Sequence, residues 1–451
     1  MSLGSSLQSA ASCTLTIVIL VALPTTHGCA QQQRPGPAAL TLRVFLDSVR
    51  ALHPTLLAAS SRVRAAEGGR ASAGAFGNPI IGYQVDQTPF PGGHPLVGME
   101  REAMTTATLP LEFLYQRKPR VDRANAEVRA AAAEAVVTRQ RLGLDAAAAF
   151  YRTGLAQVQA SVTHDLLDWL DTLVAYNRAR AEEGVAAEAD LIRSEVERDR
   201  VGAEAAMQDA ELVQARAALG AFLPSGRFSD VGPRVVLDGA PMPLPASRAL
   251  SADTVAAPRG LEVRPEVRAA RERLAASNAD IASERSMLIR QLGATIGTMR
   301  TGHKSSMIAG LSLPFPLVDQ NRGAIQHASA ERDAAAFELA AQERMAEADL
   351  RGAQESVRIL TERASRLASR DSSGFLARAD ESRRIALGAY REGAVPLFQV
   401  IDAARSWSEA RTTYYRTIVT QHQSVLLLLV AQGRDLFLEA TLPAATGGTF
   451  R

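Results

Sequence analysis

The chain has 451 residues, a formal net charge of +2 and 22% charged residues. It is too long for a single compact core, so we expect several domains or an extended architecture. The nearly balanced charge gives no indication of a nucleic-acid-binding surface. Aromatic residues make up only 5% of the chain, and many apolar positions are alanine, which favours closely packed helices over a thick globular core.

Residues 1–30 are typical of an export signal. They hold an apolar run at 15–23, followed by proline and small residues, and cleavage after Ala30 is expected. Alternatively, the sequence Thr-His-Gly-Cys makes Cys29 the lipidated first residue of a lipoprotein, although Thr26 stands where an aliphatic residue is usual. In either case the mature chain has at most one cysteine and no internal disulfide. No later segment is apolar for long enough to predict a transmembrane helix.

The two halves of the chain carry the same landmarks in the same order, which predicts a tandem duplication. Leu-Pro-Leu at 109–111 parallels Leu-Pro-Phe at 313–315, and the same offset places Ala124 opposite Ala328. Further parallels, upstream and downstream, are 53–68 with 264–279 and 182–195 with 391–404. The predicted organisation is a first repeat over 53–222, a Pro/Gly-rich connector over 223–262, a second repeat over 263–433 and a tail over 434–451.

Each repeat is predicted to open with a helix whose first turn holds a proline, where the missing N–H costs nothing. Two strands follow in each repeat, because apolar residues alternate there with a second set at a period of two. The opening helices are predicted over 54–73 and 265–285. The strands are predicted over 81–85 and 109–115 in the first repeat and over 292–298 and 307–313 in the second, with a turn at 300–306.

A long coiled-coil helix is predicted next in each repeat, because small apolar residues recur every seven positions. In the first repeat it runs over about residues 120–183 and ends at the turn residue Gly184. In the second repeat the same pattern at 339–367 leads to a turn at Gly393. Return helices are predicted over 189–219 and 397–429.

The number of predicted strands limits how the chain can form a barrel. Four strands leave two unpaired edges and cannot close a barrel, and single-chain membrane barrels begin at about eight strands. Three copies would supply about twelve strands, and the long hairpins of the same copies would form a tube below them. The predicted fold class is therefore mostly α with a small β part: a tandem-repeat protomer of coiled-coil hairpins and four strands, which forms a trimeric twelve-stranded β-barrel on a twelve-helix α-barrel.

The pattern resembles the TolC-type family of outer-membrane efflux proteins over essentially the whole mature chain. The motifs that carry the resemblance are LPLEFLYQRKPRVDRANAEV at 109–128, LSLPFPLVDQNRGAIQHASAE at 311–331, EEGVAAEADL at 182–191 and YREGAVPLFQVIDA at 390–403. The first of these resembles a run found in the heavy-metal branch of the family. The resemblance implies an N-terminal equatorial segment at 31–52, a homotrimer in the outer membrane with its helical tunnel in the periplasm, a periplasmic adaptor and an inner-membrane pump.

The resemblance also implies that the hairpin tips close the periplasmic end of the duct. It assigns Asp190 and Tyr390 to holding the tips shut and makes Asp402 one of two acidic constriction positions. The chain departs from the family at Gln399, where the second acid is expected, and at Val395, where a basic latch residue is expected. In the alternative interpretation, Asp190 and Asp402 are ordinary solvated acids near helix N-termini.

The tips themselves need turn residues. A helix that reverses direction requires a residue free to adopt a positive φ, which predicts such a φ at Gly184 and Gly393. Because the family meets its adaptor at the tips, Gly184, Val185, Gly393 and Ala394 are candidate docking residues. The alternative is that these residues serve only the turns.

Prolines mark the predicted passage from each strand pair to its long helix, because proline can neither extend a sheet ladder nor occupy a helix interior. The predicted barrel–tunnel joints are Pro110, Pro119, Pro314 and Pro316. Asp319 or Asn321 is expected to cap the long helix of the second repeat.

The predicted function is a passive outer-membrane exit duct of a tripartite efflux system for small molecules or metal ions. The expected partners are further copies of the chain, a periplasmic adaptor, an inner-membrane pump and outer-membrane lipids, with no nucleic acid. Two alternatives remain, a periplasmic coiled-coil scaffold or adaptor without a pore and a duct for type I protein secretion. No enzymatic activity and no cofactor are expected, since the sequence holds no phosphate-binding loop, nucleophile motif or histidine pair at metal-ligand spacing.

Overall fold

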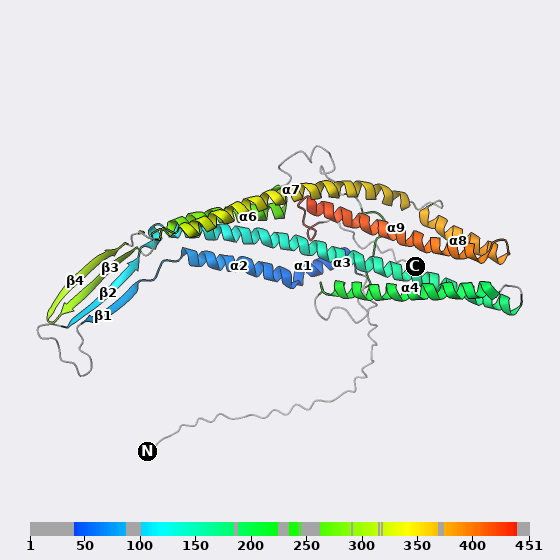
Figure 1. Ribbon diagram of the computed structural model, residues 1–451, viewed down its shortest axis with the longest axis horizontal. Coiled ribbons are helices and arrows are strands. Elements are labelled where there is room, and N and C mark those ends of the chain that lie inside the picture. The colour runs from blue at the N-terminus through cyan, green and yellow to red at the C-terminus, as the bar shows by residue number, and fades with distance from the viewer. Residues whose placement is uncertain are drawn as a thin grey trace, which may run out of the picture. The chain divides into compact units, whose positions relative to one another are not determined.

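The computed structural model in Figure 1 describes residues 40–86, 101–184, 188–223, 234–242, 244, 262–289, 292–313, 316, 319–368 and 374–439. The predicted signal region 1–30 with Cys29, the tip residue Val185, the joint residue Pro314 and residues 440–451 lie outside the described residues. The described part consists of long helices and one four-stranded sheet. This confirms the predicted class, mostly α with a small β part.

The helices follow the predicted bounds closely. They are α1 (Leu42–Leu52), α2 (Pro54–Gly74), α3 (Arg117–Glu182), α4 (Glu188–Gly220), α6 (Pro265–Ser286), α7 (Arg322–Leu367), α8 (Phe375–Arg391) and α9 (Leu397–Ala431). The opening helices α2 and α6 each carry proline in their first turn, as predicted. No helix among the described residues is long and apolar enough to cross a membrane.

One helix prediction was wrong. The coiled-coil pattern of the second repeat predicts a single helix that continues to the tip, but α7 ends at Leu367 and α8 begins at Phe375. The intervening sequence, Ser-Arg-Asp-Ser-Ser-Gly at 369–374, is rich in residues whose side chains compete for backbone hydrogen bonds and favour turns. The seven-residue apolar pattern does not reveal such an interruption.

The four strands form one antiparallel sheet in the order β1-β2-β3-β4. They are β1 (Ile80–Asp86), β2 (Glu102–Pro110), β3 (Gly293–Thr301) and β4 (Lys304–Ser312). The central pair β2–β3 joins the two repeats, with Thr105 opposite Thr298. The turn between β3 and β4 is tighter than predicted, and its Gly302 adopts a φ of 55°.

The predicted strand at 109–115 was wrong in extent. The strand β2 ends at Pro110, and Glu112–Leu114 forms a short 3-10 helix, η1. The side chains of Tyr115 and Gln116 then donate hydrogen bonds to the carbonyl oxygen of Ile289 at 2.6 and 2.8 Å. These long-range bonds direct the chain toward the start of α3. The segment therefore does not form the strand that its period-two alternation of apolar residues predicts.

The two faces of the sheet differ, as the alternation predicts. One face carries exposed apolar side chains, among them Ile81 at 79% exposure and Met307 at 75%. The other face is formed largely by glycine, threonine, glutamine and serine. Gly297 on this face allows close strand contact, because a Cβ there would lie 2.3 Å from the carbonyl oxygen of Thr105. The sheet therefore has one face suited to lipid and one suited to water.

The joints between sheet and helices use proline in several ways. Pro110 is the last residue of β2 and Pro119 lies in the first turn of α3, where proline is tolerated, while Pro316 is half-buried. Asn321 occupies the N-cap position of α7 with a φ of 53°. The sequence predicts a cap from Asp319 or Asn321. The side chain of Asn321 makes no cap bond, and its Nδ2 donates instead to the carbonyl oxygen of Glu284 at 2.8 Å, whereas Oδ1 of Asp319 accepts from the backbone amide of Asn321 at 2.9 Å.

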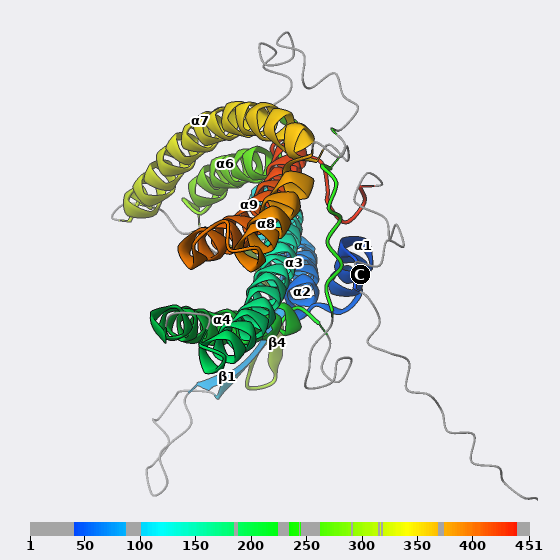
Figure 2. The ribbon, with the colours of Figure 1, turned by 90° about the vertical axis from the view of Figure 1, so that its right-hand side faces the viewer.

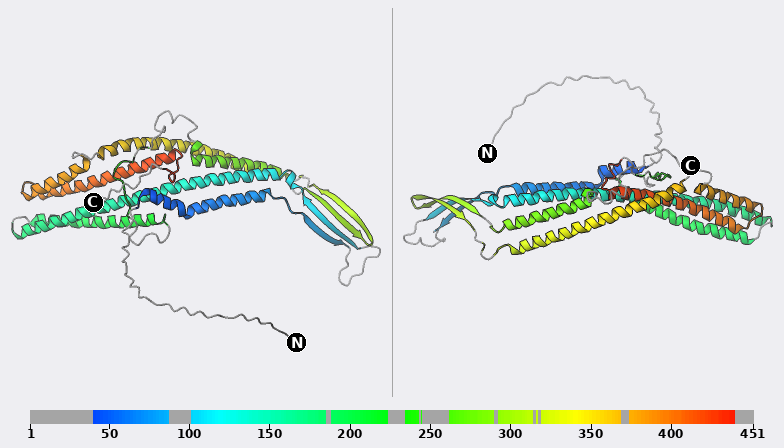
Figure 3. Two further views of the ribbon diagram at one scale, coloured as in Figure 1. Left: turned by 180° about the vertical axis from the view of Figure 1, so that it is seen from behind. Right: turned by 90° about the horizontal axis from the view of Figure 1, so that it is seen from above.

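Helix α3 runs beside α2, α4, α6 and α9, and α9 runs beside α7 and α8 (Figures 1 and 3). Close packing follows from the small residues along α3, whose buried positions are rich in alanine and glycine. The largest buried side chains, including Phe45, Phe150 and Tyr151, gather where α1, α3 and α9 meet. Figure 1 shows the sheet at one end of α3 and the two hairpin tips at the other.

Candidate functional site

The hairpin tips carry the turn geometry that the sequence predicts. Gly184 after α3 and Gly393 after α8 have φ values of 71° and 76°, which confirms the predicted positive φ. The amide of Gly393 bonds to the carbonyl oxygen of Tyr390 at 3.0 Å, and that of Ala394 bonds to Ala389 at 2.8 Å. The backbone of the second tip is therefore closed by its own hydrogen bonds, and in the first hairpin the amide of Gly184 donates to the carbonyl oxygen of Ala181 at 3.0 Å. Both glycines are exposed.

Tyr390, at the end of α8, is held against α3. Its hydroxyl donates to Oδ1 of Asn177 at 2.8 Å, and both residues are buried, with Tyr390 at 4% exposure. The ring of Tyr176 lies edge-on at 6.2 Å, and the guanidinium of Arg180 lies 5.8 Å from the Tyr390 ring centroid. Burial raises the pKa of the Tyr390 hydroxyl, and the nearby Asp190 carboxylate raises it further.

Asp190 and Tyr390 are therefore neighbours, but the structure joins Tyr390 to Asn177. Asp190 is half-buried in the first turn of α4, where an acid also complements the helix dipole. Gln399 and Asp402 are exposed on the first turns of α9, and Val395 is half-buried against the apolar residues of the hairpins. Asn177 could not be predicted from the sequence, because it lies within a uniform helical pattern.

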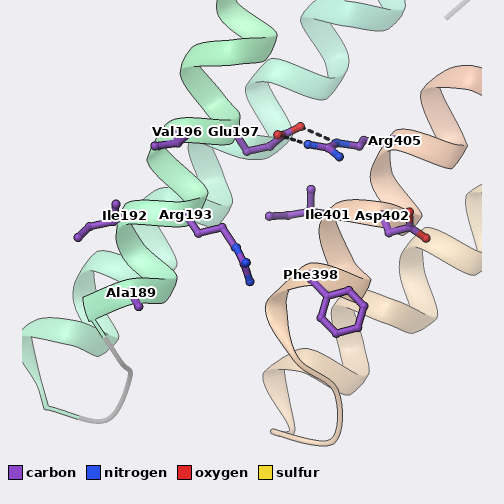
Figure 4. Close-up of a pocket in the computed structure, with 9 residues that line it drawn as sticks. All are labelled: Ala189, Ile192, Arg193, Val196, Glu197, Phe398, Ile401, Asp402 and Arg405. Carbon is purple, nitrogen blue, oxygen red and sulfur yellow. Dashed lines mark hydrogen bonds and ion pairs between the residues drawn. The ribbon is translucent and has the colours of Figure 1, made fainter.

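A groove of about 660 Å³ lies between α4 and α9, close to the tips, and Figure 4 shows the residues that line it. Its apolar walls include Ile192, Val196 and Phe398. Asp402 and Arg193 also line the groove. The groove is thus lined by one of the predicted gate acids, by a cation and by apolar side chains from both hairpins.

An ion pair joins the two hairpins across this groove. The side chain of Glu197 on α4 is only 8% exposed and accepts hydrogen bonds from Arg405 of α9 and Arg200 of its own helix. The Nε of Arg405 and Nη2 of Arg200 each lie 2.8 Å from Oε1 of Glu197. Burial by itself would raise the pKa of Glu197, but the hydrogen bonds from Arg405 and Arg200 lower it to about 2.

Glu197 and Arg405 were not predicted from the sequence as site residues. A signal was available, because Ser194, Glu197 and Val201 follow the spacing of the α4 seam that faces α3. An acid at such a position requires a partner. The packing of α4 beside α9 determines which arginine pairs with Glu197, and no local sequence pattern encodes that packing.

A second polar cluster attaches α8 to α9. The indole nitrogen of Trp407 donates to Asp380, and the guanidinium carbons of Arg383 and Arg411 lie 4.0 and 4.8 Å from the indole ring centroid. Burial lowers the pKa of Arg383. Cation–π contacts of this kind are worth more when they are desolvated, so the cluster fixes α8 on α9 a few turns from the tip.

The described residues hold no group of three or more His, Cys, Asp or Glu side chains arranged to bind a metal ion. The polar contacts at the tips are hydrogen bonds and ion pairs between helices. Their arrangement can hold two hairpins together or release them.

A two-faced antiparallel sheet that continues into long helical hairpins is a fold found in outer-membrane channels. In agreement with this class, the fold is similar to that of the outer-membrane channel OprN, with a TM-score of 0.71, 19% identity, and coverage of 88% of this chain and 90% of that one. No family model matches the chain.

Curated relatives make the assignment more specific. The chain is 30% identical over 304 residues to the nickel and cobalt resistance protein CnrC of Cupriavidus metallidurans, covering 65% of this chain and 67% of the relative. It is 23% identical over 407 residues to the cobalt-zinc-cadmium resistance protein CzcC of the same organism, covering 89% and 92%. The chain belongs to the TolC-type family of outer-membrane efflux proteins, in its heavy-metal-resistance branch. It is an outer-membrane efflux duct protein, and the alternative of a scaffold without a pore is not favoured.

Proposed function

We propose that the chain assembles as a homotrimer and forms the exit duct of a tripartite system that exports divalent transition-metal ions. The observation that carries the trimer is the sheet, in which β1 and β4 each have one neighbour within the described chain. An unpaired strand edge invites pairing with another chain. Pairing β1 of one copy with β4 of the next closes a barrel of about twelve strands from three copies.

The helices support the same assembly. Helix α4 has one seam buried against α3 and a second stripe of exposed residues at coiled-coil spacing. This second stripe consists of Ile192, Val196, Asp199, Ala203, Ala206, Ala210, Val213 and Ala217. Helix α7 carries a similar exposed stripe, Ala330, Ala334, Phe337, Ala341, Met345, Ala348, Gly352, Ser356 and Ile359. Two such stripes on each copy fit a ring in which α4 packs against the second-repeat helices of the neighbouring copy.

The tandem organisation is part of the proposal. Repeat one at 53–222 and repeat two at 263–433 each supply two strands and one hairpin, with export directed by the signal at 1–30. The joints at Pro110, Pro119, Pro314 and Pro316 separate the barrel from the tunnel. The apolar face of the sheet, which includes Ile81 and Met307, would contact outer-membrane lipids.

The tips are proposed as both the gate and the docking surface. Tyr390 with Asn177 and Asp190, and Asp402 with Gln399 on α9, would hold the tunnel entrance narrow. The tip residues Gly184, Val185, Gly393 and Ala394 would meet a periplasmic adaptor, which connects the duct to an inner-membrane pump. The duct itself is passive, so the energy for export comes from that pump.

The metal substrate is inferred from the resistance named in both relatives, nickel with cobalt and cobalt with zinc and cadmium. The test is to delete the gene in its own host and to measure growth on a panel of nickel, cobalt, zinc and cadmium salts and of unrelated drugs. Metal sensitivity that a plasmid copy restores supports the proposal. Sensitivity to drugs alone, or loss of a secreted protein without metal sensitivity, would refute the metal substrate and leave the duct in place.

A further inference from the structure

Residues 234–242 cross from α3 to α9 and are called the belt below. At one end, the amide side chain of Gln157 on α3 pairs with both backbone groups of Val235, at 3.2 Å to the carbonyl oxygen and 3.3 Å from the amide nitrogen. At the other end, Gln421 of α9 pairs in the same way with Met242, at 3.0 and 2.9 Å. Each glutamine thus forms the pair of backbone hydrogen bonds that a neighbouring strand would form. One glutamine comes from each repeat.

The centre of the belt is also seated on the helices. Leu237 lies against Gly154 of α3, where a Cβ would stand 2.5 Å from a Leu237 methyl carbon. The hydroxyl of Tyr414 on α9 donates to the carbonyl oxygen of Gly239 at 2.5 Å. The belt therefore spans the seam between α3 and α9 and ties the first repeat to the second, on the sheet side of the gate residues.

A histidine lies beneath this tie. His422 of α9 is 1% exposed, and its Nε2 lies 2.9 Å from the carbonyl oxygen of Ala240. Since a carbonyl oxygen only accepts hydrogen bonds, Nε2 must carry the proton, and the neutral ring satisfies this contact. The ring stands edge-on to Tyr151 of α3 at 5.5 Å. The hydroxyl of Tyr151 is buried without a hydrogen-bond partner among the described residues.

The titratable groups that act on His422 come from both elements packed against it. Asp238 is on the belt, where its Oδ1 accepts from the amide of Ala240 at 3.0 Å, and its charge favours a protonated ring. Tyr151 is on α3, and burial raises the pKa of its hydroxyl, so it stays neutral. A protonated His422 would therefore sit in a closed apolar layer with a single nearby carboxylate to offset its charge.

We propose that the belt is a lock on the seam between α3 and α9 which acid releases by protonating His422. With the ring neutral, the two glutamines, Tyr414 and His422 hold the belt and the two repeats in register. Protonation places a charge beneath the belt and detaches it, so that α3 and α9 can separate toward the tips. The consequence for the gate rests on the proposed duct function, whereas the release of the belt does not.

The sign of the effect follows from burial. Desolvation lowers the pKa of His422 from the ordinary value of 6.5, and the bond to Ala240 and the charge of Asp238 offset this only in part. A base whose pKa is lowered by folding contributes stability that is complete above 6.5 and falls as the pH drops from there toward its folded-state pKa. Below neutral pH, therefore, the attachment of the belt weakens.

The first test measures amide hydrogen exchange of the belt in the full-length protein in detergent at pH 7.5 and 5.5, corrected for the intrinsic exchange rate. The amides of Val235 and Met242 report directly, because each donates to a clamping glutamine. We expect protection to fall by up to about tenfold at pH 5.5. His422→Gln, which keeps a neutral donor at every pH, should abolish this fall, whereas His164→Gln on the exposed surface should leave it unchanged.

A second variant keeps the proposal falsifiable if His422→Gln does not fold. Asp238→Asn retains the oxygen that accepts from Ala240 but removes the charge that stabilises a protonated ring beneath the closed belt, so protection at pH 5.5 should fall further than in the wild type. Protection that does not change with pH in the wild type, a pH effect that persists in His422→Gln, or a fall at pH 5.5 that Asp238→Asn does not enlarge would each overturn the proposal.

Single-channel recordings distinguish a failure of the proposed lock from a failure of the proposed duct function. If both are right, acidification from pH 7.5 to 5.5 raises the open fraction of the wild-type channel and not of His422→Gln. Absence of a channel at any pH, together with acid release of the belt in exchange, refutes the duct and keeps the lock. A channel whose opening responds to acid equally in both proteins refutes the lock.

Discussion

Glu197 shows how one side chain joins two hairpins. It is an almost buried carboxylate, and its cost of burial is offset by two arginines that donate to it. Val395, where the resemblance implies a basic latch residue, precedes α9, and Arg405 farther along in α9 is a basic residue that joins the two hairpins. Tyr390 plays a comparable part between α8 and α3 through Asn177.

Glu197→Gln is expected to lower the free energy of unfolding by roughly 1–3 kcal/mol, because Arg405 loses an ionised acceptor. If the pair helps to close the tips, single-channel conductance should rise as well. Glu195→Gln is the matched control, since its partner Arg178 and the acid itself are exposed, and such pairs contribute about 0–1 kcal/mol. Equal effects of the two variants in thermal unfolding would contradict the assignment.

The same carboxylate predicts an acid limit. Because folding lowers the pKa of Glu197 from 4.5 to about 2, its contribution is complete above pH 4.5 and is lost as the pH falls from 4.5 toward 2. Unfolding midpoints measured between pH 6 and 2 should therefore converge for the wild type and Glu197→Gln at the acid end. A difference that persists undiminished at pH 2 would show that the ion pair is not its cause.

Tyr390→Phe removes only the hydroxyl that donates to Asn177. A buried acceptor is then left unpaired, which costs about 1–3 kcal/mol, and the proposed gate should open more readily in planar bilayers. Tyr176→Phe is the control, because this neighbouring ring has no hydroxyl contact among the described hydrogen bonds. Unchanged conductance in Tyr390→Phe would remove Tyr390 from the gate.

At the level of elements, the tips depend on backbone conformation more than on side-chain contacts. Gly184 and Gly393 adopt a positive φ, and a Cβ at either position would meet no atom within 4 Å. Any cost of substitution there is therefore conformational strain. The helices on either side are long and are stabilised by their packing on α3 and α9.

Gly393→Ala is expected to destabilise the protein by about 1–2 kcal/mol, because an L side chain in this conformation meets the following carbonyl oxygen. Gly388→Ala lies within α8, where a Cβ is also unobstructed, and alanine should stabilise that helix by about 1 kcal/mol. Opposite shifts in the melting temperature of the two variants would support the turn. Shifts of the same sign would contradict it.

At the level of the whole molecule, the described chain leaves surfaces that only further copies cover in the proposed ring. The sheet has two open edges, and α4 and α7 carry exposed apolar stripes. The end-on view in Figure 2 shows α4 beside α3 and α8 beside α9, the two hairpins that each copy contributes. Phe337 on α7 is 77% exposed, which is unusual for an aromatic side chain on a surface that stays in water.

Phe337→Lys should weaken the trimer without unfolding the protomer, because the substitution leaves the buried seams of α7 intact. The measurement is the mass of the detergent-solubilised protein at increasing dilution, with helicity as the check on folding. Glu338→Lys, one residue away and outside the stripe, is the control and should remain trimeric. A trimer that is equally stable in both variants would show that the α7 stripe lies outside the interface.

The sequence by itself determined the local features: the opening and return helices, the two-faced strands and the glycine turns at Gly184 and Gly393. These follow from periodicity and from backbone preferences that act within a few residues. Most of this was predicted to within a few residues. The candidate site was predicted only in part, since Asp190 and Tyr390 were placed at the tips without their contacts.

Only the tertiary structure decided which distant side chains meet. The pairing of Tyr390 with Asn177, the ion pair of Glu197 with Arg405 and the belt held by two glutamines depend on how α3, α4 and α9 pack. The tertiary structure also determines that β2 ends at Pro110, since Tyr115 and Gln116 bond to Ile289 just before α3 begins. It likewise determines that the side chain of Asn321 bonds to α6. Such contacts join residues far apart in the chain, and their energies depend on burial, which no local pattern of residues specifies.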